Sequence, residues 1–123
     1  MQHRILTTVA ALSFSLCAFA APFITIAVRT EIDGLLTRLE TSGCEFQRNG
    51  SWYSGKEARA HLQRKLDYLI DKNMVQTAEQ FIEKGASSSS SGKEYLVRCG
   101  RAEPQPAGQW LSQELKALRL QRR

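Results

Sequence analysis

Histidine and cysteine are scarce in this sequence, with two histidines and three cysteines among 123 residues. His61 is the only histidine after residue 3, and no two cysteines form a Cys-x-x-Cys pair. A structural zinc site needs four cysteine or histidine ligands, usually at short spacings. We therefore expect neither a metal site nor a bound cofactor.

The sequence also lacks a complete nucleotide-binding or catalytic motif. Six residues separate Gly85 from Gly92, where a Walker loop has four, and Glu94 replaces the Mg²⁺-binding hydroxyl. Residues 90–93 match the Ser-x-x-Lys motif of penicillin-binding enzymes, but the companion motifs Ser-Asp-Asn and Lys-Thr-Gly are missing. We expect no nucleotide ligand, and we interpret the serine run 87–91 as a solvated loop.

Acidic residues are fewer than basic ones, 12 against 17, which gives a formal net charge of +5. The acidic residues are interspersed among the basic ones, and this modest excess argues against a nucleic-acid partner. A weakly basic surface favours an anionic headgroup, a cell-wall polymer or an unknown envelope protein as partner. The length suits a single domain, which we expect to be a monomer.

Long apolar runs are confined to the N-terminus, which has the layout of a secretory signal peptide. Arg4 supplies a positive start, residues 5–19 are uncharged and mostly apolar, and 18–20 form an Ala-x-Ala cleavage site. We therefore interpret residues 1–20 as a signal peptide and 21–123 as one exported domain.

An uncleaved membrane anchor is the alternative. The uncharged stretch continues from Ile5 to Val28, which is long enough to span a bilayer. Pro22 interrupts the stretch, and the cleavage site is well placed, so we favour cleavage and keep an inner-membrane anchored protein as the alternative.

Helical periodicity of apolar residues predicts four helices. We expect them at 24–41, 54–72 and 77–85 and around 110–123, the last with a basic tail. Ser54 and Thr77 each begin a capping-box pattern, with Glu or Gln three residues later.

Two short alternating runs, 44–48 and 51–53, flank Asn49-Gly50, which is typical of a two-residue type I′ hairpin turn. Such a turn pairs Phe46 with Tyr53 and Gln47 with Trp52. Residues 95–99 alternate in the same way and predict a third strand. The sequence therefore predicts an α+β fold, with about four helices packed on a small antiparallel sheet.

Two cysteines remain after removal of the signal peptide, Cys44 and Cys99. An even number of cysteines in an exported protein indicates a disulfide. Alternation places Cys44 on the same face as Phe46, and Cys99 on the same face as Val97. If both faces line one core, the two thiols point the same way, and we expect a Cys44–Cys99 bridge.

Polar residues at conspicuous positions are candidates for binding. His61 and Lys65 share one edge of the second helix, four residues apart. Arg48 stands at the hairpin turn, where it could bind an anion, and Trp52 falls on the outer face of the sheet. Ser91 and Lys93 belong to the serine loop. The candidate binding residues are Arg48, Trp52, His61, Lys65, Ser91 and Lys93.

The joint pattern over about 31–120 resembles the YfeK-like family of small exported bacterial proteins. The resemblance is carried by Phe46-x-Arg48-Asn49-Gly50-x-x-Tyr53-Ser54, Ala58, His61-Leu62-x-x-Lys65, 77–82 and Ser91-Gly92-Lys93-x-Tyr95. It implies a Gram-negative periplasmic protein, and it implies no activity, because the family's domain has no known function.

These observations favour a non-enzymatic binding or interaction module of the cell envelope, with no catalytic residues assigned. Two alternatives remain. One is a small hydrolase or transferase that uses the serine loop with Lys93 or His61. The other is an accessory protein held at the membrane by an uncleaved N-terminal helix.

Overall fold

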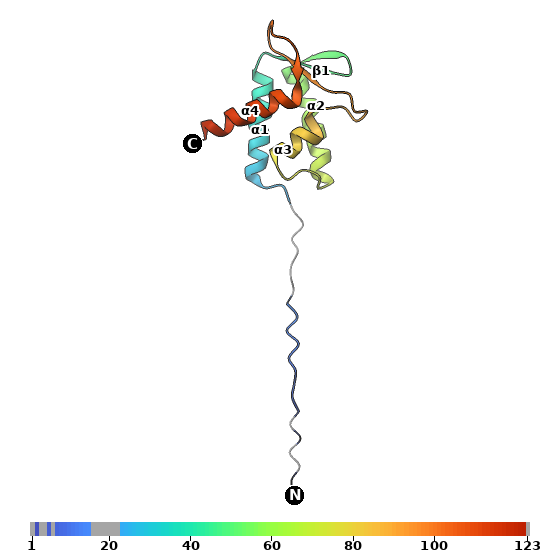
Figure 1. The fold of residues 1–123 in the computed structure, drawn as a ribbon, viewed down its shortest axis with the longest axis vertical. Coiled ribbons are helices and arrows are strands. Elements are labelled where there is room, and N and C mark those ends of the chain that lie inside the picture. Colours follow the sequence, from blue (N-terminus) through green and yellow to red (C-terminus); the bar gives the residue numbers. More distant parts are fainter. Residues whose placement is uncertain (1, 3–4, 6, 16–22, 123) are drawn as a thin grey trace.

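The computed structural model describes residues 2, 5, 7–15 and 23–122. The predicted cleavage site after Ala20 lies outside these residues, and so does Cys17. Residues 7–15 have no regular secondary structure and extend away from the rest of the chain (Figure 1). Among the described residues, no helix combines the length and apolarity needed to cross a membrane.

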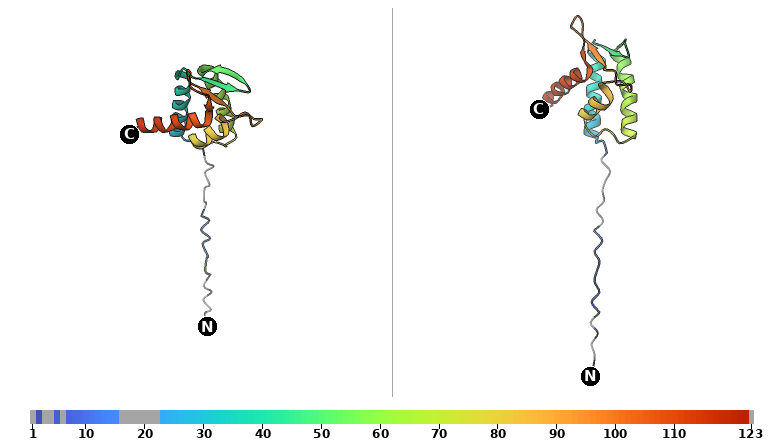
Figure 2. Two further views of the ribbon diagram at one scale, coloured as in Figure 1. Left: turned by 45° about the horizontal axis from the view of Figure 1, so that its top comes forward. Right: turned by 45° about the vertical axis from the view of Figure 1, so that its right-hand side comes forward.

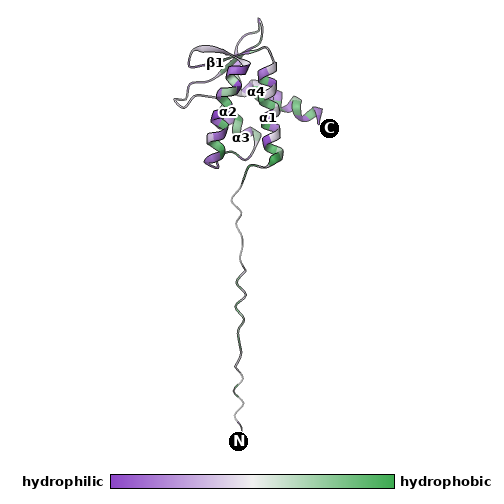
Figure 3. Cartoon of the chain, turned by 180° about the vertical axis from the view of Figure 1, so that it is seen from behind, coloured by the Kyte–Doolittle hydropathy of each residue, from purple (hydrophilic) through white to green (hydrophobic). Residues whose placement is uncertain are grey.

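Two long helices lie side by side in the domain, α1 (Ile26–Thr41) and α2 (Gly55–Asp71). The start of α1 is set by Thr25, whose side chain accepts a hydrogen bond from the Val28 amide, so the helix begins two residues later than predicted. The predicted capping box of α2 is confirmed: Ser54 and Glu57 satisfy each other's backbone N–H groups. Both helices carry hydrophobic residues on one side and hydrophilic residues on the other (Figure 3).

A four-stranded antiparallel sheet lies across one end of these helices (Figures 1 and 2). Its strands are β1 (Glu45–Arg48), β2 (Ser51–Ser54), β3 (Leu96–Arg98) and β4 (Gln105–Pro106), in the order β2-β1-β3-β4. Asn49 and Gly50 have φ angles of 49° and 83°, as a type I′ turn requires. The register pairs Phe46 with Tyr53 and Gln47 with Trp52, as predicted.

The predicted disulfide is confirmed, because Cys44 and Cys99 are bonded. The register of β1 and β3 pairs Glu45 with Arg98, so the two cysteines stand opposite each other one position further along. Their Cα atoms are 4.2 Å apart. The bond therefore ties the chain that leaves α1 to the end of β3, across the buried side of the sheet.

The C-terminal half departs from the predictions in three places. The second capping box is only half formed: Thr77 accepts from the Gln80 amide, but the Gln80 side chain accepts from the amide of Gln76 instead. Helix α3 (Ala78–Phe81) gives way to a π-helical turn, Ile82–Ala86. The third departure is β4. The prolines on either side of Gln105 predict a break between elements, whereas the structure has a short strand there.

Helix α4 (Ala107–Gln121) closes the fold, packing on α1 and on the π-helical turn. All the helices and the inner face of the sheet share one hydrophobic core. Its largest fully buried side chains are Tyr95, Phe46, Phe81, Ile32, Leu35, Leu36, Leu39, Leu62, Leu111, Val75 and Val97. The predicted α+β class is therefore confirmed, with four α-helices on a small antiparallel sheet.

Candidate functional site

Arg48 is the last residue of β1, and its side chain lies on the face of the strand that is directed toward the core. Phe46 and its partner Val97 are almost fully buried, and Arg48 follows two residues later on the same face. Continuing the register of β1 and β3 places Tyr95 opposite Arg48. A charged side chain therefore stands at the edge of the core, where only part of it reaches solvent.

Helix α2 supplies the other two polar side chains of this cluster. His61 and Lys65 lie one helical turn apart and are both half-buried, beside the buried Leu62. Both side chains reach the hydroxyl of Tyr95, whose residue is only 1% exposed. The helix thus places two basic groups around one buried phenol.

A chain of short hydrogen bonds connects the four residues. Arg48 Nη1 lies 2.5 Å from His61 Nδ1, and His61 Nε2 lies 3.2 Å from Tyr95 Oη. Lys65 Nζ donates to Tyr95 Oη at 3.0 Å and to the carbonyl of Ser88 at 2.8 Å. We call Arg48, His61, Lys65 and Tyr95 the basic cluster.

The bonding partners determine the protonation of His61. A guanidinium can only donate, so Nδ1 accepts from Arg48 and the ring proton sits on Nε2, which donates to Tyr95. Burial, reinforced by the charges of Arg48, Lys65 and Arg64, lowers the pKa of His61 to about 4. The imidazole is therefore neutral at pH 7.

The same bonds leave the hydroxyl proton of Tyr95 available for a further partner. Its oxygen accepts from both His61 and Lys65. Among the described residues it has no acceptor for its own O–H. The phenol can therefore donate to a ligand that approaches the basic cluster.

Two hollows flank the Arg48–His61 pair, which lines both. One, of about 310 Å³, is polar and is completed by Asn49, Lys65, Ser89, Ser90 and Tyr95. The other, of about 300 Å³, is completed by Phe46, Tyr53, Glu57, Ala58, Ala60 and Arg64. The hairpin turn and the serine loop project on the same side of the molecule (Figures 1 and 2), and the polar hollow lies between them.

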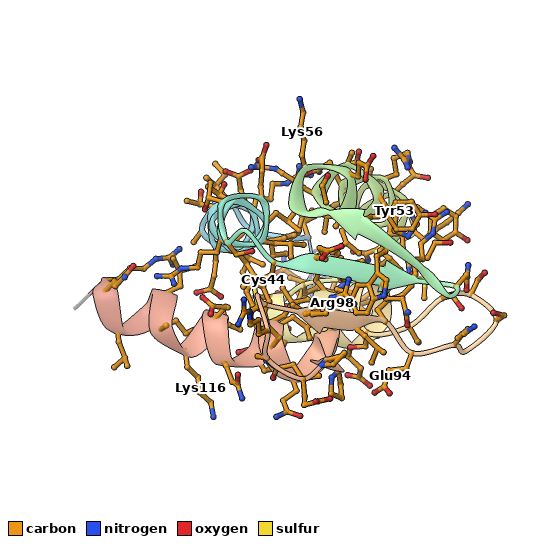
Figure 4. The ribbon with its side chains drawn as sticks, turned by 90° about the horizontal axis from the view of Figure 1, so that it is seen from above. Cys44, Tyr53, Lys56, Glu94, Arg98 and Lys116 are labelled. Atoms are coloured by element: carbon orange, nitrogen blue, oxygen red, sulfur yellow. A yellow bond between two sulfur atoms is a disulfide. The ribbon has the colours of Figure 1, made fainter. Side chains whose placement is uncertain are left out.

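The basic cluster has no acidic counterpart within the described part of the chain. All seven ion pairs found there involve other arginines, namely Arg38, Arg59, Arg98, Arg119 and Arg122. Glu57 borders the second hollow, but its carboxylate accepts the Ser54 amide. Glu94 lies on the side of β3 away from α2 (Figure 4). Arg48 and Lys65 thus share an open hollow, and neither has a carboxylate partner in the part of the chain that the structure describes.

Comparison with known proteins gives a family for the chain. A family described as "Family of unknown function (DUF5329)" matches residues 26–119. The "Uncharacterized protein YfeK" of Salmonella typhimurium is 38% identical over 96 residues, covering 76% of this chain and 77% of that protein. The chain belongs to the DUF5329 family. No solved structure matches it.

The DUF5329 match confirms the resemblance to YfeK-like proteins. It spans the basic cluster, both hollows and the disulfide, and it begins after the predicted signal peptide. The name of the family assigns no activity, so any function must be inferred from the side chains. In the described part of this DUF5329 chain, no group of three histidine, cysteine or acidic side chains could hold a metal ion.

The structure brings together three of the six predicted binding residues, Arg48, His61 and Lys65. Trp52 lies on the opposite face of the sheet, where the Arg98 guanidinium covers it 4.0 Å from the ring centroid. Lys93 Nζ lies over the hairpin turn, 3.8 Å from the position a Cβ would take on Gly50.

Ser91 is exposed, and its hydroxyl bonds that of Ser89. The serine loop has hydrogen bonds of its own: Ser89 and Lys93 are joined by two, one between backbone groups and one to the Ser89 hydroxyl. Neither Ser91 nor Lys93 lines the hollows described above.

Tyr95, Asn49, Ser89 and Ser90 complete the site but were absent from the predicted set. The signal for Tyr95 was present, because a tyrosine on a core face needs a partner for its hydroxyl. Alternation along β1 also places Arg48 on the core side with Phe46. The sequence does not show that this face meets α2 at His61.

The neutral state of His61 predicts a specific loss of stability in acid. An unfolded histidine titrates near pH 6.5 and the folded one near 4, so the unfolded state binds more protons between these values. Stability should therefore fall as pH drops from 6.5 to 4. We expect the loss at this half-buried site to be on the order of 1–2 kcal/mol, allowing for solvent screening.

The substitution His61→Gln isolates this effect, because glutamine can still accept from Arg48 and does not titrate. Urea unfolding at both ends of the pH range should show a smaller acid-induced loss in the variant than in the unmodified chain. Ion-paired carboxylates such as Glu79, whose pKa the hydrogen bond from Arg119 lowers, contribute equally to both proteins. Equal losses would refute the assignment of a neutral His61.

Proposed function

We propose that this chain is a non-enzymatic binding module of the bacterial cell envelope that holds an anionic group of its ligand at the basic cluster. The observation that carries the proposal is the pair Arg48 and Lys65, which share an open hollow and have no carboxylate partner among the described residues. Tyr95, Asn49, Ser89 and Ser90 line the same hollow. Charge-assisted hydrogen bonds to such a group are stronger than neutral ones.

The candidate ligands are those of the sequence prediction: an anionic headgroup, a cell-wall polymer or an acidic surface of an envelope protein. Export through cleavage after Ala20 is part of the proposal, with membrane anchoring by residues 5–28 as its alternative. The names of the family and of the YfeK relative state neither a cellular location nor a ligand.

A hydrolase that uses the serine loop is less well supported. His61 and Lys65 both direct their hydrogen bonds to Tyr95, not to a serine hydroxyl. The Ser89 hydroxyl bonds Ser91 and accepts the Lys93 amide. Covalent catalysis needs a nucleophile within hydrogen-bond reach of its base. No serine in the described loop has this arrangement.

Calorimetric titration of the purified chain with inorganic phosphate and with acetate tests the proposal. We expect saturable binding that Arg48→Gln weakens by about tenfold or more, because a hydrogen bond to a charged group contributes ~1.5–3 kcal/mol. Lys65→Gln should also weaken it. Lys56→Gln removes the same charge from an exposed residue pointing away from the sheet (Figure 4), and should change affinity by about twofold or less.

Circular dichroism of each variant controls for loss of the fold. Two results would overturn the proposal: no binding by the unmodified chain, or equal losses in Lys65→Gln and Lys56→Gln. Equal losses would mean that the anion responds only to net charge.

A further inference from the structure

Arg48 lines both hollows. The one of about 300 Å³ has the more apolar lining and is called the apolar hollow. Phe46, Tyr53, Ala58 and Ala60 form its walls, between the β1–β2 hairpin and one side of α2. Arg48 and His61 close it on the side of the polar hollow. When the anionic group of a ligand contacts Arg48, the rest of the ligand therefore lies next to an apolar surface of the protein.

We propose that the ligand is a small amphipathic anion, with a carboxylate or phosphate at the basic cluster and an apolar body in this second hollow. The proposal rests on the anion-binding function proposed above. Binding sites for small molecules are mostly apolar, with a few polar groups that fix orientation. The two hollows together have this composition, and the second hollow is the more apolar of the two.

The charges around the apolar hollow fit such a ligand. Arg48 and Arg64 are both on its lining, and neither has an ion-pair partner among the described residues. The one acid on the lining, Glu57, is held by the Ser54 amide at the start of α2. Arg48 and Arg64 therefore attract the anionic head of a ligand whose apolar body lies in this hollow, and they repel a cationic ligand.

The volume limits the size of the apolar body. About 300 Å³ is at the small end of the range for ligand pockets. The Arg48 guanidinium also lies over the Tyr53 ring, 5.5 Å from the ring centroid. The hollow therefore suits a short alkyl chain or a single ring and is too small for a long lipid tail.

The test compares anions that share a head and differ in the body. Acetate is paired with octanoate, and inorganic phosphate with octyl phosphate, each titrated calorimetrically into the full chain. Each buried methylene corresponds to about fourfold in affinity, so burial of only two gives about 15-fold. We expect the longer member of at least one pair to bind at least about tenfold more tightly. If the gain in affinity is larger from acetate to octanoate, the head of the ligand is a carboxylate; if it is larger from phosphate to octyl phosphate, the head is a phosphate.

Ala60 provides a variant that fills the apolar hollow from a position outside the basic cluster. Ala60 is exposed on α2 and lines only the apolar hollow, so Ala60→Trp should fold normally and occupy the space. We expect it to abolish the advantage of the longer anions, while saturable binding of acetate and phosphate is retained. Ala27→Trp, on an exposed position of α1, is the matched control and should change neither.

The outcomes separate this inference from the function on which it rests. If no anion binds, the proposed function fails. If short and long anions bind equally well, or if Ala27→Trp reduces the advantage as much as Ala60→Trp, the amphipathic ligand is wrong and anion binding still holds.

Discussion

Reduction of the Cys44–Cys99 disulfide is expected to lower the melting temperature by about 10 °C or more. The bond closes a loop of 55 residues, and the chain-entropy model assigns about 4 kcal/mol to closure of a loop of that length. That figure is an upper value, because residual structure in the unfolded chain reduces it. A domain of this size loses ~4–8 °C per kcal/mol, and its whole stability is only ~5–15 kcal/mol.

Thermal unfolding followed by circular dichroism, with and without dithiothreitol, measures this effect. The double variant Cys44→Ala, Cys99→Ala is the control, since its melting temperature should be low and should not respond to the reductant. Peptide mapping of the unreduced protein should yield the Cys44–Cys99 pair. An unchanged melting temperature after complete reduction would show that the bond contributes nothing to the stability of the fold.

Replacement of Gly55 by alanine is expected to destabilise the domain by about 2–3 kcal/mol. Gly55 is the first residue of α2, and a Cβ there would lie 2.5 Å from the carbonyl oxygen of Leu39 and 3.0 Å from that of Glu40. Both obstacles are backbone atoms at the end of α1, so no side-chain rotation relieves them. Overpacking of a well-packed contact typically costs about 1–3 kcal/mol, and occasionally more.

Urea unfolding compares Gly55→Ala with Lys56→Ala, the neighbouring exposed residue of the same helical turn. Alanine is the better helix former at both positions, so propensity alone predicts a gain for each. A loss at Gly55 with little change at Lys56 would establish the close approach of the two helices. Equal stability of Gly55→Ala and the unmodified chain would mean that the two helices are further apart.

The elements predicted correctly from the sequence are those governed by near neighbours in the chain. Asn49-Gly50 needs only its own backbone angles to form the turn, and the turn then sets the register of the hairpin. Because side chains alternate along a strand, the same register predicts that Cys44 points toward the core with Phe46. Ser54 and Glu57 likewise cap α2 with groups three residues apart.

Two of the missed features depend on distant residues. The need for glycine at position 55 comes from the end of α1, and strand β4 forms because β3 provides a partner for Gln105 and Pro106. Neither partner is visible in the local sequence pattern. The capping box at Thr77 is different, because the competing amide belongs to the neighbouring Gln76 and takes the Gln80 side chain.

The candidate site shows the same division. Arg48, His61 and Lys65 were chosen one by one as polar residues at unusual positions. Their connection through Tyr95 needs the pairing of β1 with β3 and the packing of α2, both long-range contacts. Trp52 and Lys93 were chosen by the same reasoning, but Trp52 lies on the opposite face of the sheet and Lys93 lies over the hairpin turn.

The central claim, that an anion binds between Arg48 and the serine loop, is tested most directly by a ¹H–¹⁵N NMR titration of the full chain with inorganic phosphate. We predict saturable shifts of the Arg48 Nε–H signal and of the Asn49, Ser89 and Ser90 amides, and none at Ala27 on α1. Shifts confined to the basic end of α4, or no saturable shift at all, would contradict the claim.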